Sequence, residues 1–310
     1  MTIPLIDFSA ADDPSCSADL SGDVHRAFVD DGFLMLKNTR MDPNLVSSVF
    51  AASRSFFTGP MTTKRACQYL SAQENFGYQG LGQENLDPSA PADLKETFTM
   101  RNILNVPIAE ERWPSAEFKA LMSAFYADAL RVAQQLQSVL CNALELPGDY
   151  FSNCHTGENI SLRLLYYPAI DAQRAAEMQA TDGQMGAGAH TDYGLLTLLF
   201  QDNVGGLQVL GANQTWQNVD PVPQGIVVNS GDLLERWTND RYCSTLHRVV
   251  PISGAHDRLS IAMFIDPDSN TEVSALNSCI SIDKPATHAP ITAGEHIQQK
   301  LEASHKNRFS

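Results

Sequence analysis

The chain has few positive charges, and this shortage excludes one broad class of partner. Only 21 of its 310 residues are lysine or arginine, against 36 aspartates and glutamates, and the formal net charge is −15. Proteins that bind DNA or RNA neutralise backbone phosphates with basic side chains. We therefore expect no nucleic-acid partner.

Long apolar runs, a leader segment and paired cysteines are also missing. No uncharged apolar run approaches the roughly 18 residues of a membrane span. The start, MTIPLIDFSAADD, has no basic region followed by an apolar stretch. We expect no membrane partner and, by default, a cytoplasmic location. None of the six cysteines forms a Cys-x-x-Cys pair, so neither a zinc ribbon nor a disulfide framework is expected.

Residues 1–160 form a helix-rich N-terminal part. Apolar spacing and punctuating residues predict a strand in PLIDF, a helix over 22–31, a strand in GFLMLKN, helices over 42–57 and from residue 60, and a long helix over 114–146. Between them, the polar, glycine-containing stretch 71–91 predicts a long loop. Such loops commonly cover functional cavities.

Residues 161–285 consist of short β-rich runs separated by turns. Seven or so such runs at close spacing, among them GLLTLLFQD and RLSIAMFIDP, favour a double-stranded β-helix, or jelly roll. A C-terminal helix is expected within 286–310. We see no linker, so the prediction is one domain over 1–310, mainly β with flanking helices.

The sequence His190-Thr191-Asp192 carries the main chemical signal. In a strand, residues i and i+2 point to the same side, so an imidazole and a carboxylate can face one point. His247, on another predicted strand, is the best third ligand. Two histidines and one carboxylate on one face of an ion are typical of non-haem Fe(II) oxygenases. The pair alone is weak evidence, because a surface strand can carry it by chance.

Arg258 and Ser260 repeat the same spacing on the next predicted strand. A planar guanidinium beside a hydroxyl suits the carboxylate of a ligand. Together with the metal site, the pair suggests a 2-oxo-acid co-substrate.

Four segments give the chain a family resemblance: GAGAHTDYGLLTLLFQDNVGGLQV, VVNSGDLLERWTND, STLHRVV and RLSIAMFIDP. They resemble the Fe(II)/2-oxoglutarate-dependent dioxygenases of the isopenicillin N synthase-like group. Within it, the chain is similar to thymine-hydroxylase-type enzymes and, around His190, to ethylene-forming enzymes. IPLIDFS and DDGFLMLKN resemble that group's opening segment, so the similarity spans nearly the whole chain.

The resemblance implies a set of roles. His190, Asp192 and His247 would hold Fe(II), with no catalytic residue beyond these ligands, and Arg258 and Ser260 would bind the C5 carboxylate of 2-oxoglutarate. Tyr167 falls where plant members have a tyrosine that helps to bind the co-substrate, whereas Leu165 replaces the plant asparagine. With O2, such an enzyme would oxidise, most simply hydroxylate, a small molecule and release succinate and CO2.

The substrate contacts are predicted from position and from the same resemblance. Arg163 and Phe264 lie on strands of the expected barrel, and Asn75 and Tyr78 flank the long loop. A guanidinium can donate to a carbonyl oxygen and an aromatic ring can stack, which suits a pyrimidine-like ring. Each of these residues could equally be packing.

Three other functions remain open from the sequence. The Arg-x-Ser pair also occurs in oxidases of the group that do not use 2-oxoglutarate. A catalytically inert jelly-roll metal-binding protein would keep the same ligands. A zinc hydrolase could use them too, but would leave Arg258 and Ser260 without a purpose. A monomer or homodimer is expected.

Overall fold

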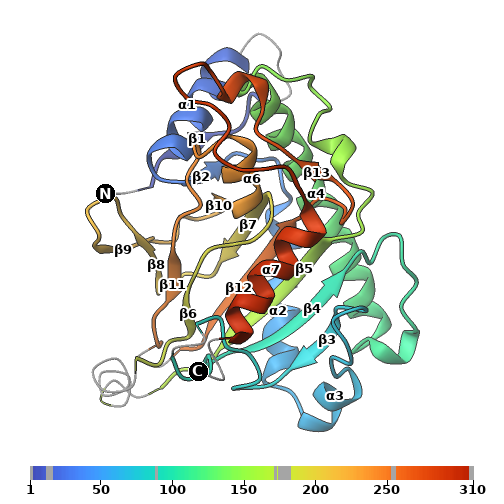
Figure 1. Ribbon diagram of the computed structural model, residues 1–310. Helices are drawn as coiled ribbons and strands as arrows, with labels where there is room; N and C mark the ends of the chain where they lie inside the picture. The colour runs from blue at the N-terminus through green and yellow to red at the C-terminus, as the bar shows by residue number, and fades with distance from the viewer. Residues whose placement is uncertain are drawn as a thin grey trace.

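The computed structural model describes residues 3–11, 17–87, 90–170, 173, 183–252 and 256–306. Two facing sheets form the centre of the fold (Figure 1). The larger has the spatial order β1 (Leu5–Asp7), β2 (Phe33–Lys37), β10 (Ile226–Ser230), β7 (Leu196–Gln201), β12 (Arg258–Ile265), β5 (Ile160–Tyr167), β4 (Glu96–Arg101) and β3 (Phe76–Gln79). The smaller has the order β6 (Ala187–His190), β11 (His247–Val249), β8 (Leu207–Leu210) and β9 (Trp216–Asn218). This arrangement confirms the predicted jelly-roll core.

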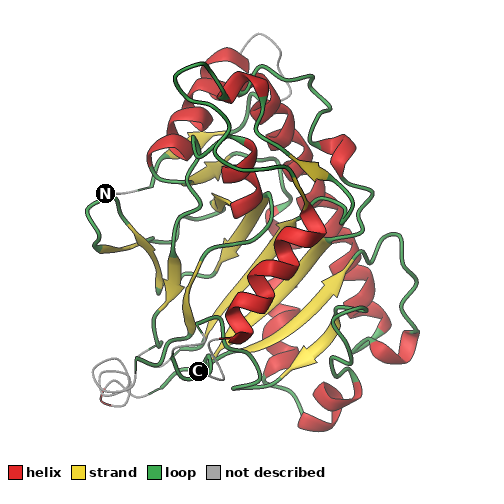
Figure 2. Cartoon of the chain, viewed as in Figure 1, coloured by secondary structure: helices red, strands yellow, loops and turns green. Residues whose placement is uncertain are grey.

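Helices flank the sheets, as Figure 2 shows in red. They are α1 (Ser17–Asp30), α2 (Pro43–Phe57), α3 (Met61–Ala66), α4 (Ala116–Ala143), α6 (Asp232–Trp237) and α7 (Ala293–Lys306), and the small pair β13 (Glu272–Val273) and β14 (Ile291–Thr292) precedes α7. The side chain of Asp42 caps α2 and that of Ser115 caps α4, each accepting from a backbone N–H of the first turn. The expected helices over 42–57 and 114–146 are therefore present, with ends that differ by at most three residues.

The two faces of the large sheet have different partners. On β5, Leu162, Leu164 and Tyr166 join the core that packs against α1, α2 and α4. The alternate residues Leu165 and Tyr167 belong to a second core facing the small sheet. Because strand side chains alternate between faces, the sheet holds the helices on one side and leaves the other for a cavity.

The expected long loop over 71–91 is wrong in part. Phe76–Gln79 forms β3, which pairs with β4, a strand that the sequence pattern did not indicate. Gly77 suggested a turn, yet its role is close approach: it has φ +118°, and a Cβ there would lie 2.6 Å from the carbonyl oxygen of Cys67. Strands β1 to β4 of the helix-rich part thus extend the sheet of the jelly roll.

The sequence analysis expected neither a disulfide framework nor a membrane span. The five cysteines among the described residues are free thiols. In the same ranges, no helix has the length and apolar character needed to cross a membrane.

Candidate functional site

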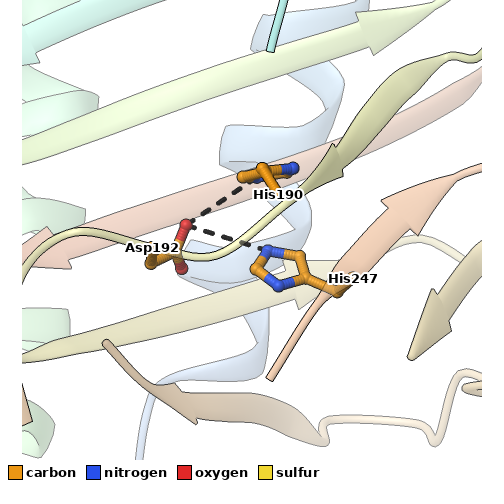
Figure 3. Close-up of side chains that lie close together, drawn as sticks. All are labelled: His190, Asp192 and His247. Atoms are coloured by element: carbon orange, nitrogen blue, oxygen red, sulfur yellow. Dashed lines mark ion pairs between the residues drawn. The ribbon is translucent and has the colours of Figure 1, made fainter. Parts of the chain in front are cut away.

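His190, Asp192 and His247 meet between the two sheets. His190 ends β6 and His247 begins β11, and the two are direct cross-strand partners. Nε2 of His190 lies 3.8 Å from Oδ1 of Asp192, and Nε2 of His247 lies 3.7 Å from the same oxygen (Figure 3). One ligand atom from each residue lies within 4.8 Å of the others. Antiparallel pairing therefore brings together residues that are 57 positions apart in the chain.

The hydrogen bonds of both histidines leave Nε2 free to bind a metal. Nδ1 of His190 lies 2.7 Å from the carbonyl oxygen of Gly188, and Nδ1 of His247 lies 3.1 Å from that of Thr245. A carbonyl only accepts, so each Nδ1 carries a proton, and Nε2 is the ring nitrogen of each histidine that faces the site. Burial, together with repulsion from His247, lowers the pKa of His190 to about 3, so this imidazole is neutral near pH 7.

The carboxylate of Asp192 is oriented by two donors. Its Oδ2 accepts from Oγ1 of Thr197 at 2.5 Å and from Nδ2 of Asn229 at 2.7 Å, which turns Oδ1 toward the histidines. Burial raises the pKa of Asp192, but the two histidines and these hydrogen bonds outweigh it, and the pKa lies below its usual value. The carboxylate is thus ionised. Two imidazole nitrogens and a carboxylate oxygen facing one point fit a divalent metal ion.

Asp192 itself lies outside the strand that the sequence predicted for it. Strand β6 ends at His190, and the chain turns so that the carbonyl of Asp192 accepts from the backbone N–H of Asp232, at the start of α6. The spacing of two residues remains effective because the turn, and not the strand pleat, directs the carboxylate.

Arg258 lies on the same side of the large sheet as the triad and is fully buried. Its Nη1 donates to Oγ of Ser260 at 3.0 Å, its Nη2 donates to Oε1 of Gln201 at 3.1 Å, and its guanidinium carbon lies 4.8 Å from the ring centre of Tyr167. Nε of Arg258 has no hydrogen-bond partner among the residues that the structure describes. Among the described residues, no carboxylate lies within ion-pair distance of Arg258. A buried cation without a counter-ion is costly, which fits a site for an anionic ligand.

Asp257, which precedes Arg258 in the sequence, does not neutralise its guanidinium. The carboxylate of Asp257 instead accepts from the hydroxyl of Tyr166 and the backbone N–H of Ala169, and it lies 3.8 Å from Nη1 of Arg54.

A cavity of about 240 Å³ joins the triad to Arg258. This volume is just below the roughly 300 to 1,000 Å³ usual for ligand sites, a size that suits small molecules. The predicted residues Arg163 and Phe264 line it. Residues that the sequence did not indicate also line it: Phe33, Leu86, Lys95, Thr197, Asn229, Asp266 and Ile297. A polar residue within an apolar strand, as in IVVNS, is the one signal that could have identified Asn229.

Asn75 and Tyr78, both predicted substrate contacts, are not among the residues that line this cavity. Tyr78 is buried in β3, and its hydroxyl donates to Glu96 at 2.5 Å. Asn75 precedes that strand and accepts from the hydroxyl of Tyr69 at 3.3 Å. The pairing of β3 with β4 places Tyr78 outside the cavity, and Asn75 lies immediately before this strand.

A larger hollow of about 690 Å³ lies beside α2, against β7 and β10. Neither the triad nor Arg258 lines this hollow. It is therefore not the candidate active site, although it is larger than the cavity beside the triad.

Comparisons with known proteins agree with this geometry. Residues 159–267 match the family model of the 2OG-Fe(II) oxygenase superfamily, and residues 3–116 match the N-terminal model of non-haem dioxygenases in morphine synthesis. A proline hydroxylase of Petromyces alliaceus is 32% identical over 87% of this chain and 88% of its own. The chain belongs to the 2OG-Fe(II) oxygenase superfamily.

Two solved structures show the same fold in members of this superfamily. A thymine hydroxylase of Neurospora crassa, in complex with alpha-KG, is 31% identical, with a TM-score of 0.86 over 97% of this chain and 96% of its own. JOX2 in complex with 2OG, Fe and JA is 26% identical, with a TM-score of 0.80 over 97% of this chain and 85% of its own. The oxygenase described here is thus an oxidoreductase that uses Fe(II), 2-oxoglutarate and O2.

Proposed function

We propose that His190, Asp192 and His247 hold the iron, and that Arg258, Ser260 and Tyr167 bind 2-oxoglutarate. The observation that carries this proposal is a single cavity with three metal-ligating side chains and, on a neighbouring wall, a buried guanidinium that has no counter-ion among the described residues. When bound, the iron and 2-oxoglutarate together activate O2 for oxidation of a substrate C–H bond, with succinate and CO2 as the co-products.

The side chains of the protein supply position and a dry environment. Thr197 and Asn229 keep the carboxylate of Asp192 facing the histidines. Arg258 and Ser260 anchor the co-substrate at one end, so that its 2-oxo group extends toward the triad. Leu86 and Ile297 line the same cavity and exclude water from it.

For the substrate, we propose a small, compact, polar molecule such as a pyrimidine. Arg163 and Phe264 support this, because the cavity offers both a guanidinium and an aromatic ring. The related Neurospora enzyme has been solved in complex with alpha-KG and thymine. Its 31% identity to this chain supports testing thymine first.

The test measures succinate release from 2-oxoglutarate with Fe(II) and O2. It compares thymine, uracil and other nucleobases with small amino and carboxylic acids, and product formation separates coupled from uncoupled turnover. Coupled oxidation of a nucleobase is the expected result. If only an unrelated metabolite is oxidised, the proposal of a pyrimidine substrate is wrong, and the assignment as an oxygenase is unaffected.

The same assay separates the other candidate functions. Substrate oxidation without release of succinate would indicate an oxidase that does not use 2-oxoglutarate. Metal-dependent hydrolysis would indicate a zinc enzyme. Stoichiometric metal binding with no turnover would indicate an inert binding protein. The cytoplasmic location and the monomeric or homodimeric state stay predictions.

A further inference from the structure

A cluster of four charged side chains lies at the Arg163 end of the cavity, and two of them, Arg163 and Lys95, line the cavity itself. Nη2 of Arg163 donates to Oε1 of Glu84 and, at 3.3 Å, to Oγ1 of Thr97. Nζ of Lys95 lies 2.7 Å from Oδ2 of Asp93 and 3.5 Å from Oε2 of Glu84. The side chains of Lys95 and Asp93 are 1% exposed, and those of Arg163 and Glu84 are 18% exposed. Two cations and two carboxylates thus form one neutral group.

This cluster and the site of Arg258 lie at opposite ends of the cavity. Tyr167 pairs with Arg258 across β5 and β12, whereas Arg163 pairs with Ala262. The four-residue step from Arg163 to Tyr167 along β5 corresponds to about 13 Å at roughly 3.3 Å per residue. A co-substrate anchored at Arg258 therefore leaves Arg163 for the substrate.

Glu84 is the carboxylate that neutralises Arg163. Asp93 does not pair with Arg163. It binds Lys95 and accepts from the backbone N–H groups of Gly188 and Leu86. Burial lowers the pKa of Arg163 to about 10, so the guanidinium stays charged at neutral pH. Without Glu84, this end of the cavity would carry one uncompensated positive charge.

The charges of this cluster satisfy one another. Oε1 of Glu84 accepts from Nη2 of Arg163, and Oε2 of Glu84 lies 3.5 Å from Nζ of Lys95. A neutral ligand beside Arg163 would leave this balance unchanged. A second carboxylate there would add a negative charge that no cation of the cluster is left to neutralise.

We propose that Glu84 is a specificity-determining residue that makes the cavity select a neutral substrate and reject a second carboxylic acid. The proposal rests on the proposed function, because it takes the Arg258 end to be occupied by 2-oxoglutarate. A carboxylate placed beside Arg163 would also lie near the carboxylate of Glu84, which accepts from the same guanidinium, and like charges in a desolvated site disfavour binding. A neutral amide meets no such repulsion.

Two planar probes of nearly the same shape test the charge preference without turnover. Benzamide and benzoate are titrated calorimetrically into the protein loaded anaerobically with Fe(II) and saturating 2-oxoglutarate. The wild type should bind benzamide about ten-fold or more tightly than benzoate, the low end of what hydrogen bonds to charged groups contribute. Tighter binding of benzoate by the wild type overturns the proposal whatever the variants do.

Variants then assign the preference to Glu84. Glu84→Gln keeps the shape and removes the charge, so benzoate should bind at least ten-fold tighter than to the wild type. The double variant Glu84→Gln with Arg163→Gln restores neutrality and should lose that gain. Glu74→Gln is the matched control, because Glu74 pairs with Arg112 away from the cavity, and it should change neither probe.

A benzoate affinity that Glu84→Gln leaves unchanged, including one too weak to detect in either protein, also overturns the proposal. Failure of the proposed function is recognised separately. It would appear as no binding of Fe(II) or 2-oxoglutarate during loading, or as no coupled oxidation in the turnover assay. A neutral substrate other than a pyrimidine would leave the role of Glu84 intact.

Discussion

Replacing Arg258 by lysine tests the co-substrate site most directly, because the substitution keeps the positive charge and removes the planar guanidinium that can donate two parallel hydrogen bonds. Arg258 is held by Ser260 through Nη1 and by Gln201 through Nη2, which fixes the plane of the guanidinium. A lysine ammonium is a point charge and cannot form a two-pronged contact with a carboxylate. Losing one charge-assisted hydrogen bond costs about 1.5 to 3 kcal/mol, or roughly 10- to 150-fold in affinity for 2-oxoglutarate.

The assay is anaerobic calorimetric titration of 2-oxoglutarate into the Fe(II)-loaded protein. Arg248→Lys serves as the control, since Arg248 stacks on Trp216 with its guanidinium carbon 4.1 Å from the ring centre and does not line the cavity. It should leave the affinity for 2-oxoglutarate unchanged. If Arg258→Lys binds 2-oxoglutarate within two-fold of the wild type, the guanidinium does not hold the co-substrate.

Arg258→Met provides an independent measurement on the same residue. A buried charge without a counter-ion destabilises the fold, and an apolar side chain of similar length removes that cost. The variant should abolish binding of 2-oxoglutarate, while the Tm of the apoprotein stays the same or rises. A large fall in Tm would instead indicate that Arg258 has a structural role.

Three further predictions concern the metal site and the surrounding scaffold. Asp192→Ala and His247→Ala should each abolish stoichiometric Fe(II) binding and turnover; full iron content and turnover in both would refute the ligand set. Asn229→Ala should weaken Fe(II) binding by roughly 10- to 100-fold, the usual cost of losing a residue that orients a ligand; affinity equal to that of the wild type would argue against this orienting role. Burial lowers the pKa of His155 from its usual value of 6.5. As the pH falls, the unfolded chain therefore takes up a proton at His155 before the folded chain does. The contribution of neutral, buried His155 to stability is present above pH 6.5 and is lost as the pH falls through the lowered pKa. The difference in unfolding free energy between the wild type and His155→Gln should therefore shrink between pH 7 and pH 5, and a constant difference would contradict this origin.

The sequence predicted the parts of the site that depend on short spacing. His190 with Asp192, and Arg258 with Ser260, are pairs two residues apart, and local backbone geometry brings each pair to one side of the chain. The long helices were equally predictable, because their apolar spacing and their caps at Asp42 and Ser115 are local signals.

Long-range pairing decided the rest of the site. Asn229, Lys95 and Ile297 reach the cavity from β10, from the segment before β4 and from α7, and no spacing within the sequence relates them. The place of Tyr78 depends on pairing in the same way, since β3 lies against β4 and the hydroxyl of Tyr78 donates to Glu96 and not into the cavity. Local spacing fixes which side chains point the same way, whereas the order of strands in a sheet determines which of those side chains share a cavity.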